Sequence, residues 1–520
     1  MSVFPHSQLL FSPSQTVVIS GPHIQLLDTS TGALLATTID RTEVDINKAG
    51  PIRVAALDST GTHLATSADD KQLRLWRLDG LALLNERELP KKPTGLAFTR
   101  DGQTILASDK FGDIFSYALT PPPQTPAQKN AALASHENPS GGALVLGHAS
   151  FLTAFLLAPD EKFIVTADRD EHVRVSWFPQ GYTIETYCLG HQKFVSALCL
   201  PPFAPDTLVS GGGDPMLKVW DWLRGTLVRE IPVLDAVAPF FKVKPARRTP
   251  RRFEDDDGDG DDGGKKKSRK EKARAKHQRK DGSAEAGPAE EAEPAEDVPE
   301  PLEADAAQPP EDTGPVFALR RIEALQPDPS DTAGYLIFSA VGATALFSCP
   351  FSASAAADVA ALDFGAPVLD FSVARDGFVW VSLDGQWAEG APSAMVRVVR
   401  LAAGKLVELD AAATTALVTA LNSTCLLPAT ANALRTLDLY QALSALPKNN
   451  DAEHDPMDRA PLESASDAGR ELSLKELGRL KSKTAVAKKA QLARPAEEEE
   501  EREAKRARSE PDDVVMDGVS

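Results

Sequence analysis

The sequence has few of the features that mark secreted, membrane-spanning or metal-binding proteins. Its 520 residues include four cysteines, Cys188, Cys199, Cys349 and Cys425, and no two of them form a CxxC pair. This spacing argues against a zinc ribbon or a disulfide framework, and it fits ordinary buried thiols in a reducing compartment. No apolar run approaches the ~18 residues of a membrane span, and the N-terminal stretch lacks a basic region followed by an apolar core. We therefore expect an intracellular soluble protein with no membrane contact.

Recognisable catalytic motifs are also missing. The sequence has no HExxH, Walker or dinucleotide-binding fingerprint, and no serine or cysteine lies in a nucleophile motif. The glycine run SGGGD at 210–214 has the composition of a phosphate loop, but the residues after it continue as a strand and not as a helix. The acidic run EDDDGDGDDGG at 254–264 fits only the first half of a calcium loop, because Lys266 stands where a bidentate glutamate belongs. We expect no catalytic residue, no cofactor site, no metal site and no small-molecule substrate.

A repeating strand pattern is present instead. The pairs Gly147-His148 and Gly190-His191 each precede an apolar strand, a polar corner and a second strand that ends in an aromatic residue. Their separation falls within the ~40 to 45 residues of a WD repeat, in which four antiparallel strands form one propeller blade. Three corners superimpose with Asp70, Asp170 and Asp214 in register, namely SADDKQLRLW (67–76), ADRDEHVRVSW (167–177) and SGGGDPMLKVW (210–220).

These repeats predict an all-β fold, a seven-bladed WD-repeat β-propeller with a disordered charged insertion and a disordered C-terminal tail. We expect blades 1–5 within residues 1–235, the insertion at 236–313, blades 6 and 7 at 314–447, and the tail at 448–520. The insertion and the tail consist of charged blocks that cannot bury enough apolar surface to offset chain entropy. The segment SQLLFSPSQ at 7–15 is expected to supply the outer strand of the last blade and so close the ring.

Histidines ahead of the inner strands indicate a structural network. In WD repeats such a histidine hydrogen-bonds toward the corner aspartate and, through a serine or threonine, toward the tryptophan of the next strand. A satisfied, partly buried polar network is a better interpretation of these residues than a catalytic His-Asp pair. The predicted members are His148, Asp170, His191, Ser210, Asp214 and Trp220.

The segment from Ala167 to Leu198 resembles a known family closely. RDEHVRVSW followed by the pattern LGH-x-x-FVS is similar to the WD-repeat, non-catalytic subunit of the eukaryotic tRNA (guanine-N7-)-methyltransferase. The stretches ASDKFGDIFSYAL (107–119) and VSGGGDPMLKVWDWLRG (209–225) resemble the same family, so that the likeness covers most of residues 50–230.

This resemblance implies a division of labour. In that family a separate subunit binds S-adenosylmethionine and methylates N7 of a guanine in the tRNA variable loop, while the propeller holds that subunit in its active form. The chain would then be a non-catalytic scaffold without a cofactor of its own, forming a heterodimer with the catalytic subunit and meeting tRNA through the complex. Arg174 would pair with a carboxylate of that subunit and Glu171 with a basic side chain. The further partner-facing residues implied are Arg169, His172 and Lys193.

Alternatives remain open at this point. A charged propeller corner can be a solvated turn with internal ion pairs, and the chain could be a generic WD-repeat adaptor in a chromatin or ubiquitin-ligase assembly. A basic run in the insertion could be a solvated segment, an RNA contact or a nuclear localisation signal, and a nuclear location is our expectation. The residues of that run are Lys265, Lys266, Lys267, Arg269 and Lys270.

Overall fold

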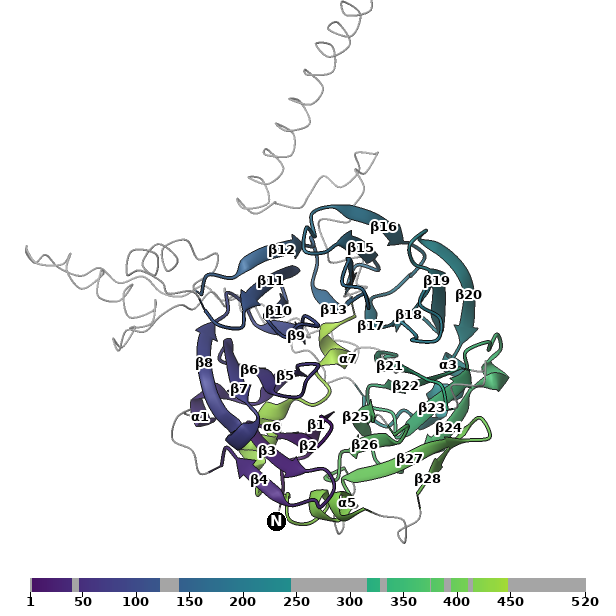
Figure 1. The fold of residues 1–520 in the computed structure, drawn as a ribbon. Helices are drawn as coiled ribbons and strands as arrows, with labels where there is room; N and C mark the ends of the chain where they lie inside the picture. Colours follow the sequence, from purple (N-terminus) through teal and green to yellow (C-terminus); the bar gives the residue numbers. More distant parts are fainter. Residues whose placement is uncertain are drawn as a thin grey trace, which may run out of the picture. The chain divides into compact units, whose positions relative to one another are not determined.

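The folded part of the chain consists of seven antiparallel sheets of four strands each (Figure 1). The computed structural model describes residues 2–39, 46–121, 140–244, 316–327, 334–374, 376–387, 394–409 and 415–447. The first strands of the sheets are neighbours all the way round, because each contacts the first strand of the next sheet and β1 contacts both β5 and β25. The described residues therefore form a closed seven-bladed β-propeller, as the sequence predicts.

The first four blades follow one another along the chain. Blade 1 contains β1 (His6–Phe11), β2 (Gln15–Ser20), β3 (His23–Asp28) and β4 (Leu34–Thr37). Blade 2 contains β5 (Ile52–Leu57), β6 (His63–Ala68), β7 (Gln72–Arg77) and β8 (Ala82–Glu88). Blade 3 contains β9 (Pro93–Phe98), β10 (Thr104–Asp109), β11 (Asp113–Ala118) and β12 (Ala143–Gly147). Blade 4 contains β13 (Leu152–Leu157), β14 (Phe163–Asp168), β15 (Val173–Trp177) and β16 (Ile184–Cys188).

The remaining three blades complete the ring. Blade 5 contains β17 (Val195–Cys199), β18 (Thr207–Gly212), β19 (Met216–Asp221) and β20 (Thr226–Pro232). Blade 6 contains β21 (Leu319–Leu325), β22 (Tyr335–Ala340), β23 (Ala345–Pro350) and β24 (Ala360–Asp363). Blade 7 contains β25 (Val368–Val373), β26 (Val379–Leu383), β27 (Val396–Ala402) and β28 (Lys405–Glu408). Short helices lie between blades, namely α1 (Ile46–Ala49), α3 (Leu234–Val237) and η2 (Ala238–Phe240), or between the third and fourth strands of a blade, namely η1 (Asp79–Leu81) and η3 (Ala356–Asp358).

The position of a strand in its blade decides how polar it is. The second and third strands are covered on both faces by neighbouring blades, and β14 and β19 are accordingly buried along almost their whole length. The fourth strand lies at the circumference, and β16 and β20 expose most of their residues. Antiparallel strands tolerate this one-sided exposure. Apolar sequence segments therefore form the second and third strands of a blade, and segments of mixed polarity form the fourth.

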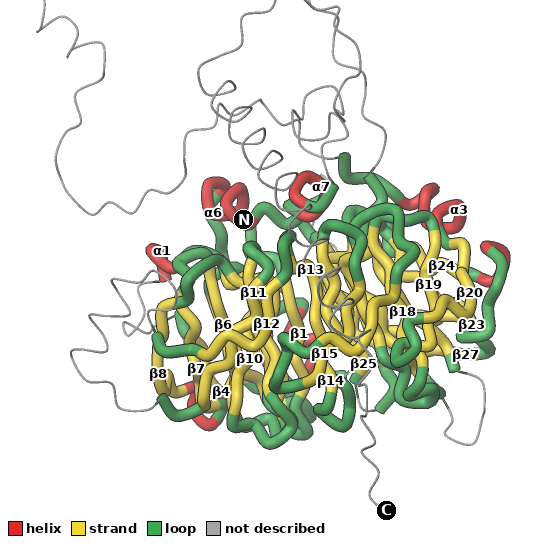
Figure 2. The backbone as a smooth tube through the Cα atoms, turned by 90° about the horizontal axis from the view of Figure 1, so that it is seen from above, coloured by secondary structure: helices red, strands yellow, loops and turns green. Residues whose placement is uncertain are grey.

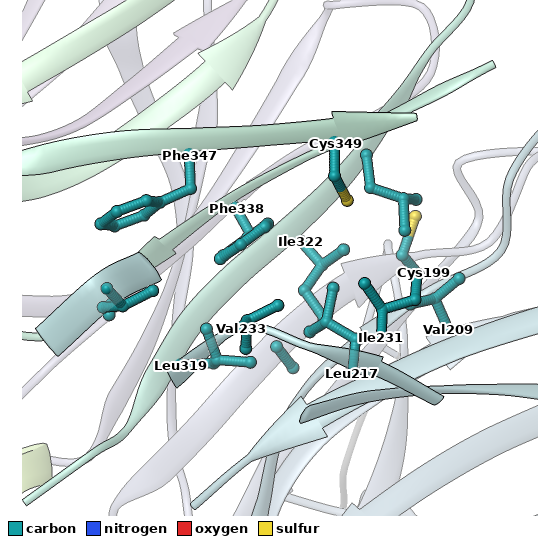
Figure 3. Packing of buried hydrophobic residues seen from close by; sticks show 14 of the residues in the cluster. Cys199, Val209, Leu217, Ile231, Val233, Leu319, Ile322, Phe338, Phe347 and Cys349 are labelled. Atoms are coloured by element: carbon teal, nitrogen blue, oxygen red, sulfur yellow. The ribbon is translucent and has the colours of Figure 1, made fainter. Parts of the chain in front are cut away.

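The hydrophobic core lies between blades and not within a single sheet. The largest cluster joins blades 5 and 6, where Leu217 of β19 meets Ile322 of β21 and Phe338 of β22 (Figure 3). The rings of Phe338 and Phe347 stack with centroids 5.4 Å apart. Full burial of one such side chain stabilises the fold by roughly 1.5–3 kcal/mol, so each blade depends on the next for its stability.

The ring closes in a different way from the one that the sequence suggested. The segment at 7–15 does not supply the outer strand of the last blade, because most of it forms β1, the innermost strand of blade 1, and pairs with β2. The outer strand of blade 7 is β28, which pairs with β27. Leu9 of β1 packs in a cluster with Trp380 and Val396 of blade 7, and the hydroxyl of Ser372 donates to the carbonyl oxygen of Leu9 at 2.8 Å. Side-chain packing between complete blades therefore closes the ring.

A strap of three short helices follows the last blade. This C-terminal strap, residues 415–447, contains α5 (Ala416–Leu421), α6 (Ala431–Leu437) and α7 (Ala442–Ala445). Figure 2 shows α6 and α7 on the same side of the ring as α3, which we call the upper rim. The upper rim carries the turns between the second and third strands and the connections between blades. A cavity of about 410 Å³ lies there, lined by strap residues and by rim residues that include Arg53, Lys92 and Lys110.

The insertion begins later than the sequence suggested. Residues 236–244 still belong to the described fold, since η2 follows α3 and Phe241 forms an isolated bridge with Ala343 of blade 6. The predicted disorder at 245–313 and at 448–520 concerns residues outside the described part of the chain. Within the described part, no helix has the length and apolar character needed to cross a membrane.

Candidate partner-docking corner

The charged corner of blade 4 is a tight turn held by one carboxylate. Asp168 ends β14, and its Oδ1 accepts from the backbone N–H groups of Asp170 at 2.9 Å and His172 at 3.0 Å. Glu171 has a φ of 76°, in the left-handed region that non-glycine residues seldom adopt. The turn therefore presents Glu171 and His172 at the upper rim in a fixed arrangement.

The histidine network of blade 4 uses a different aspartate from the predicted one. His148 Nδ1 lies 3.0 Å from Asp168 Oδ2, and His148 Nε2 lies 2.8 Å from Thr166 Oγ1. The prediction put Asp170 in this position, by register with Asp214, but blade 4 places its aspartate at the end of the strand, two residues earlier. Thr166, which the sequence analysis did not name, takes the place of the serine.

Burial and hydrogen bonding shift the pKa values of this pair. Burial lowers the pKa of His148 below its ordinary value, although the hydrogen bond to Asp168 acts in the opposite direction. Burial acts to raise the pKa of Asp168, but its hydrogen bonds to His148 and to the backbone of His172 outweigh burial and leave the pKa lowered. A buried acceptor whose hydrogen bonds are this well satisfied is a structural element of the turn.

Blade 5 contains the four-residue network in its full form. His191 Nδ1 lies 2.6 Å from Asp214 Oδ2, and His191 Nε2 lies 2.7 Å from Ser210 Oγ. The indole N–H of Trp220 donates to the same Ser210 oxygen at 2.8 Å. The glycines between Ser210 and Asp214 have a packing role, because a Cβ on Gly212 would lie 2.0 Å from the carbonyl oxygen of Phe194.

Arg174 of β15 differs from its counterparts in two other blades. In blade 2 the cross-strand neighbour of Arg74 is Glu86, and the two side chains form an ion pair at 2.6 Å. In blade 5 Lys218 faces Glu230 in the same way, and these also form an ion pair. The cross-strand neighbour of Arg174 is Tyr187, so this corner lacks the carboxylate that the other two have.

The guanidinium of Arg174 consequently has unused hydrogen-bonding capacity. Arg174 is 7% exposed, and its Nη1 donates to the carbonyl oxygen of Gly147 at 3.0 Å. Its Nε and Nη2 are buried and have no hydrogen-bond partner in the described part of the chain. A buried cationic donor without a partner costs free energy, so this group favours the arrival of an acceptor.

The other predicted corner residues lie around Arg174 at the upper rim. His172 is exposed and lies 3.4 Å from Asp168 Oδ2, with its ring 6.3 Å from that of Tyr187. Arg169 is half-buried and donates its backbone N–H to Phe151 at 2.9 Å. Lys193 is exposed in the connection between blades 4 and 5. These side chains and Glu171 come from one turn and the connection beside it.

The loops behind the corner are anchored by the C-terminal strap. Phe194, which follows Lys193, is buried in a cluster with Leu443 and Leu446 of the strap. Phe151, whose carbonyl oxygen binds Arg169, packs against the same cluster. The strap therefore supports both loops by packing against their phenylalanine side chains.

The described residues offer little that could perform a reaction. No group of three or more histidine, cysteine, aspartate or glutamate side chains is placed to hold a metal ion in the part of the chain that the structure describes. All four cysteines are buried, and burial raises the pKa of Cys188, Cys199 and Cys349 to about 12, so their thiols stay protonated. The basic run from Lys265 to Lys270 lies outside the described residues.

Tyr187 is the corner residue that the sequence analysis missed. A signal for it was present, because the outer strands of blades 2 and 5 carry a glutamate opposite the basic residue, whereas IETYC of blade 4 has a tyrosine there. Finding it requires the cross-strand register, which depends on a bulge in each outer strand pair.

The closed ring of seven four-stranded blades and the His191–Ser210–Asp214–Trp220 network define the class of protein as a WD-repeat β-propeller. A family model described as "tRNA methyltransferase TRM82 WD40 domain" matches residues 40–142 and 129–394, which is more than half of the chain. The chain belongs to this family.

Named relatives agree with this assignment over part of their length. A "tRNA (guanine-N(7)-)-methyltransferase non-catalytic subunit trm82" of Aspergillus oryzae is 39% identical over 217 residues, covering 33% of this chain and 44% of the relative. The subunit of the same name from Vanderwaltozyma polyspora is 32% identical over 217 residues, covering 40% and 45%. The subunit WDR4 of Bos taurus is 33% identical over 188 residues, covering 36% and 42%. The chain thus spans less than half the length of each of these relatives.

Proposed function

We propose that this chain is the non-catalytic subunit of a tRNA (guanine-N7)-methyltransferase and acts as a scaffold for a separate catalytic subunit. Membership of the TRM82 WD40 family supports the proposal, and so do the names of the relatives. S-adenosylmethionine and the methyl transfer then belong to the catalytic subunit. tRNA is engaged through the complex, and the nucleus is the proposed location.

The main observation in support of this docking site is that Arg174 lacks the cross-strand carboxylate that its counterparts in blades 2 and 5 have. Arg74 and Lys218 are neutralised within their own blades, whereas Arg174 faces Tyr187 and keeps two nitrogens without acceptors. A carboxylate on the catalytic subunit would supply the missing acceptor and could bind the planar guanidinium through two parallel hydrogen bonds. Because these nitrogens are buried, docking requires the side chains that cover them to move aside.

The charges around Arg174 determine how a partner can be oriented on the docking face. Glu171 offers a carboxylate at a fixed position, and Lys193 offers an exposed ammonium on the next connection. A face with both signs of charge is complementary to a partner with the opposite arrangement, which fixes register and speeds encounter. Exposed side chains with apolar surface lie beside the corner, where Tyr187 is 38% and Leu189 is 63% exposed.

The test is co-expression with the catalytic subunit followed by pull-down. Arg174→Glu combined with Glu171→Lys should weaken the complex at least tenfold, because both contacts become repulsive. Arg174→Lys should weaken the complex to an intermediate extent, since lysine keeps the positive charge but cannot form the bidentate hydrogen bonds of a guanidinium. The matched control is Arg224→Glu combined with Glu161→Lys at the opposite rim, where Glu161 also has a positive φ.

Two outcomes would overturn the proposal at different levels. A complex of unchanged affinity in the corner variant, with its melting temperature intact, would remove the site assignment. N7-methylguanosine in bulk tRNA that is unchanged after loss of this chain would remove the proposed function and leave a propeller adaptor of another assembly.

A further inference from the structure

The cavity at the upper rim lies between the innermost strands of the blades and the C-terminal strap. Its volume is about 410 Å³, which is within the range of small-molecule binding sites. Figure 1 shows α7 near the middle of the ring, among the innermost strands. Six of these strands contribute to the lining, with Ser7, Arg53, Thr94, Thr153, Ser196 and Arg320.

Three hydroxyl groups of the lining are already used by the fold. Ser7, Thr153 and Ser196 each donate to a backbone carbonyl oxygen of a neighbouring strand. A hydroxyl group has a single proton to donate, so these three cannot also donate to a ligand. Recognition of an anion in the cavity therefore depends on the charged and amide side chains of the lining.

Basic side chains outnumber acidic ones in this lining. Among the described residues, the lining has four basic members and two acidic ones, namely Arg53, Lys92, Lys110 and Arg320 against Asp69 and Asp438. Arg53 and Lys92 share Asp69, at 2.7 Å and 3.4 Å. The cavity therefore has an excess of positive charge, although the net charge of the chain is -19.

Arg320 of β21 keeps most of its hydrogen-bonding capacity. Its Nε lies 4.0 Å from Asp370 Oδ1, whereas the Nε of Arg321 lies 3.0 Å from the same oxygen. Apart from this contact, the Arg320 side chain forms no hydrogen bond or ion pair with another described residue. The side chain is 32% exposed although it lies on an innermost strand, and it lines the cavity. Its guanidinium is therefore available to an anion that enters the cavity.

The strap and blade 6 make the rest of the site largely apolar. The apolar residues that they contribute to the lining are Leu319, Val341, Leu439, Ala442, Ala445 and Leu446. Gln441 of the strap is exposed and lines the same cavity, and its side-chain amide forms no hydrogen bond with another described residue. A ligand that matches this lining has a compact anionic group and an apolar body.

We propose that this cavity binds a small organic phosphate monoester, with the phosphate on Arg320 and the apolar part against the strap. A guanidinium can bind two phosphate oxygens through parallel hydrogen bonds. A phosphate monoester carries nearly two negative charges at neutral pH, which offsets the excess of basic over acidic side chains in the lining. A monocarboxylate offsets half of that excess and fits less well. The proposal does not depend on the proposed function, because this chain alone forms the cavity.

The test uses the full chain and phenyl phosphate as the probe, because this ester joins a phosphate to a compact ring. Calorimetric titration gives the dissociation constant, and bound ligand should also raise the melting temperature. We expect phenyl phosphate to bind and phenol, at the same concentration, to leave the melting temperature unchanged. Arg320→Gln should weaken binding by about tenfold or more, because it removes the charge that faces the phosphate. Arg400→Gln, at an exposed residue of β27 outside the lining, is the matched control and should bind like the wild type.

A second variant keeps the test valid if Arg320→Gln fails to fold. Ala445→Leu enlarges a side chain of the lining without changing its charge, and it should weaken binding by about fivefold or more because it occupies space that the ligand needs. Melts without ligand show whether each variant is folded. No binding by the wild type, or phenol binding as tightly as phenyl phosphate, would overturn the proposal. So would unchanged affinity in a folded Arg320→Gln or Ala445→Leu variant.

Discussion

At the scale of single residues, one histidine decides whether a buried corner carboxylate is stable as an anion. Asp109 and Asp168 both end the second strand of a blade and both accept backbone N–H groups of the following turn. Asp168 also has His148, and its pKa is lowered. In blade 3, Leu89 occupies the position that His148 has in blade 4. The Oδ2 of Asp109 is therefore buried without a hydrogen-bond partner in the described part of the chain, and burial raises the pKa of Asp109. The turns have the same form, but only in blade 4 do both carboxylate oxygens have hydrogen-bond partners.

This contrast predicts different costs for the same substitution. Asp168→Asn should destabilise the propeller by about 1–3 kcal/mol, because it removes a charged acceptor from three hydrogen bonds. Asp109→Asn should cost less, because it also removes the desolvation penalty of an unpaired charge. Chemical denaturation of the two variants measures the difference in the free energy of unfolding. Equal losses would show that His148 adds nothing to the stability of the anion.

Supplying the absent carboxylate of blade 4 should change binding and stability in opposite directions. Tyr187→Glu would give Arg174 the cross-strand partner that Arg74 and Lys218 have. We expect the isolated propeller to be as stable as the wild type or more so, and the complex with the catalytic subunit to be weakened at least fivefold, because the guanidinium is already satisfied. Thermal melts and pull-down measure the two effects. Val228→Glu, at a residue 58% exposed on the outer strand of blade 5, is the control, and equal weakening by both variants would contradict the argument.

At the scale of elements, the C-terminal strap connects the cavity at the upper rim to the docking corner. Leu443 is 2% exposed and packs on Phe194, directly beside Lys193. Arg53 also holds the strap, since its guanidinium donates to the carbonyl oxygens of Thr436 and Leu437. The strap is thus packed and hydrogen-bonded to the rim.

Truncating a strap side chain should therefore affect the corner. Leu443→Ala should lower the free energy of unfolding by about 2–4 kcal/mol and reduce the hydrogen-exchange protection of residues 189–196. Arg435→Ala, at an exposed residue of α6, serves as the control and should leave both unchanged. If residues 189–196 kept their normal hydrogen-exchange protection in the Leu443→Ala variant, the strap would not support the corner.

The sequence predicts some elements much better than others, for physical reasons. Blades 2, 4 and 5 are recognisable because each repeats a polar corner followed by an alternating strand that ends in tryptophan. Blade 7 ends in β28, four residues with one buried side chain, and such a short strand has too little periodicity to be found. Without it the last blade appears to lack a strand, and the segment at 7–15 is then the obvious candidate for that place. The place of Asp168 depends on turn length, and the unmatched Arg174 depends on bulges, neither of which a local pattern reveals.

At the scale of the whole molecule, stability depends on contacts that join the blades to one another, to their connections and to the strap, and two of these contacts depend on neutral histidines. His6 is fully buried and lies 2.8 Å from Ser20 Oγ and 2.9 Å from the carbonyl oxygen of Leu421, so it joins blade 1 to the strap. His148 joins the connection between blades 3 and 4 to Asp168 and Thr166. Burial lowers the pKa of both histidines, although the carbonyl of Leu421 and the carboxylate of Asp168 oppose the shift.

The lowered pKa values predict that mild acid destabilises the ring. Below about pH 6.5, the ordinary pKa of histidine, the unfolded chain takes up protons that the folded chain does not. The stability due to neutral His6 and His148 is fully present above that pH and falls by about 1.4 kcal/mol per pH unit for each histidine, until the pH reaches the lowered folded value. The lowered pKa of Asp168 acts in a separate window, below about pH 4.

Melting temperatures measured from pH 8 to pH 5 give the test. The wild type should lose stability steadily below pH 6.5, whereas His6→Gln combined with His148→Gln should melt lower at pH 8 and depend less on pH. If the double variant were as sensitive to acid as the wild type, the loss would have to come from other groups, and these two histidine contacts would not be the acid-sensitive part of the ring.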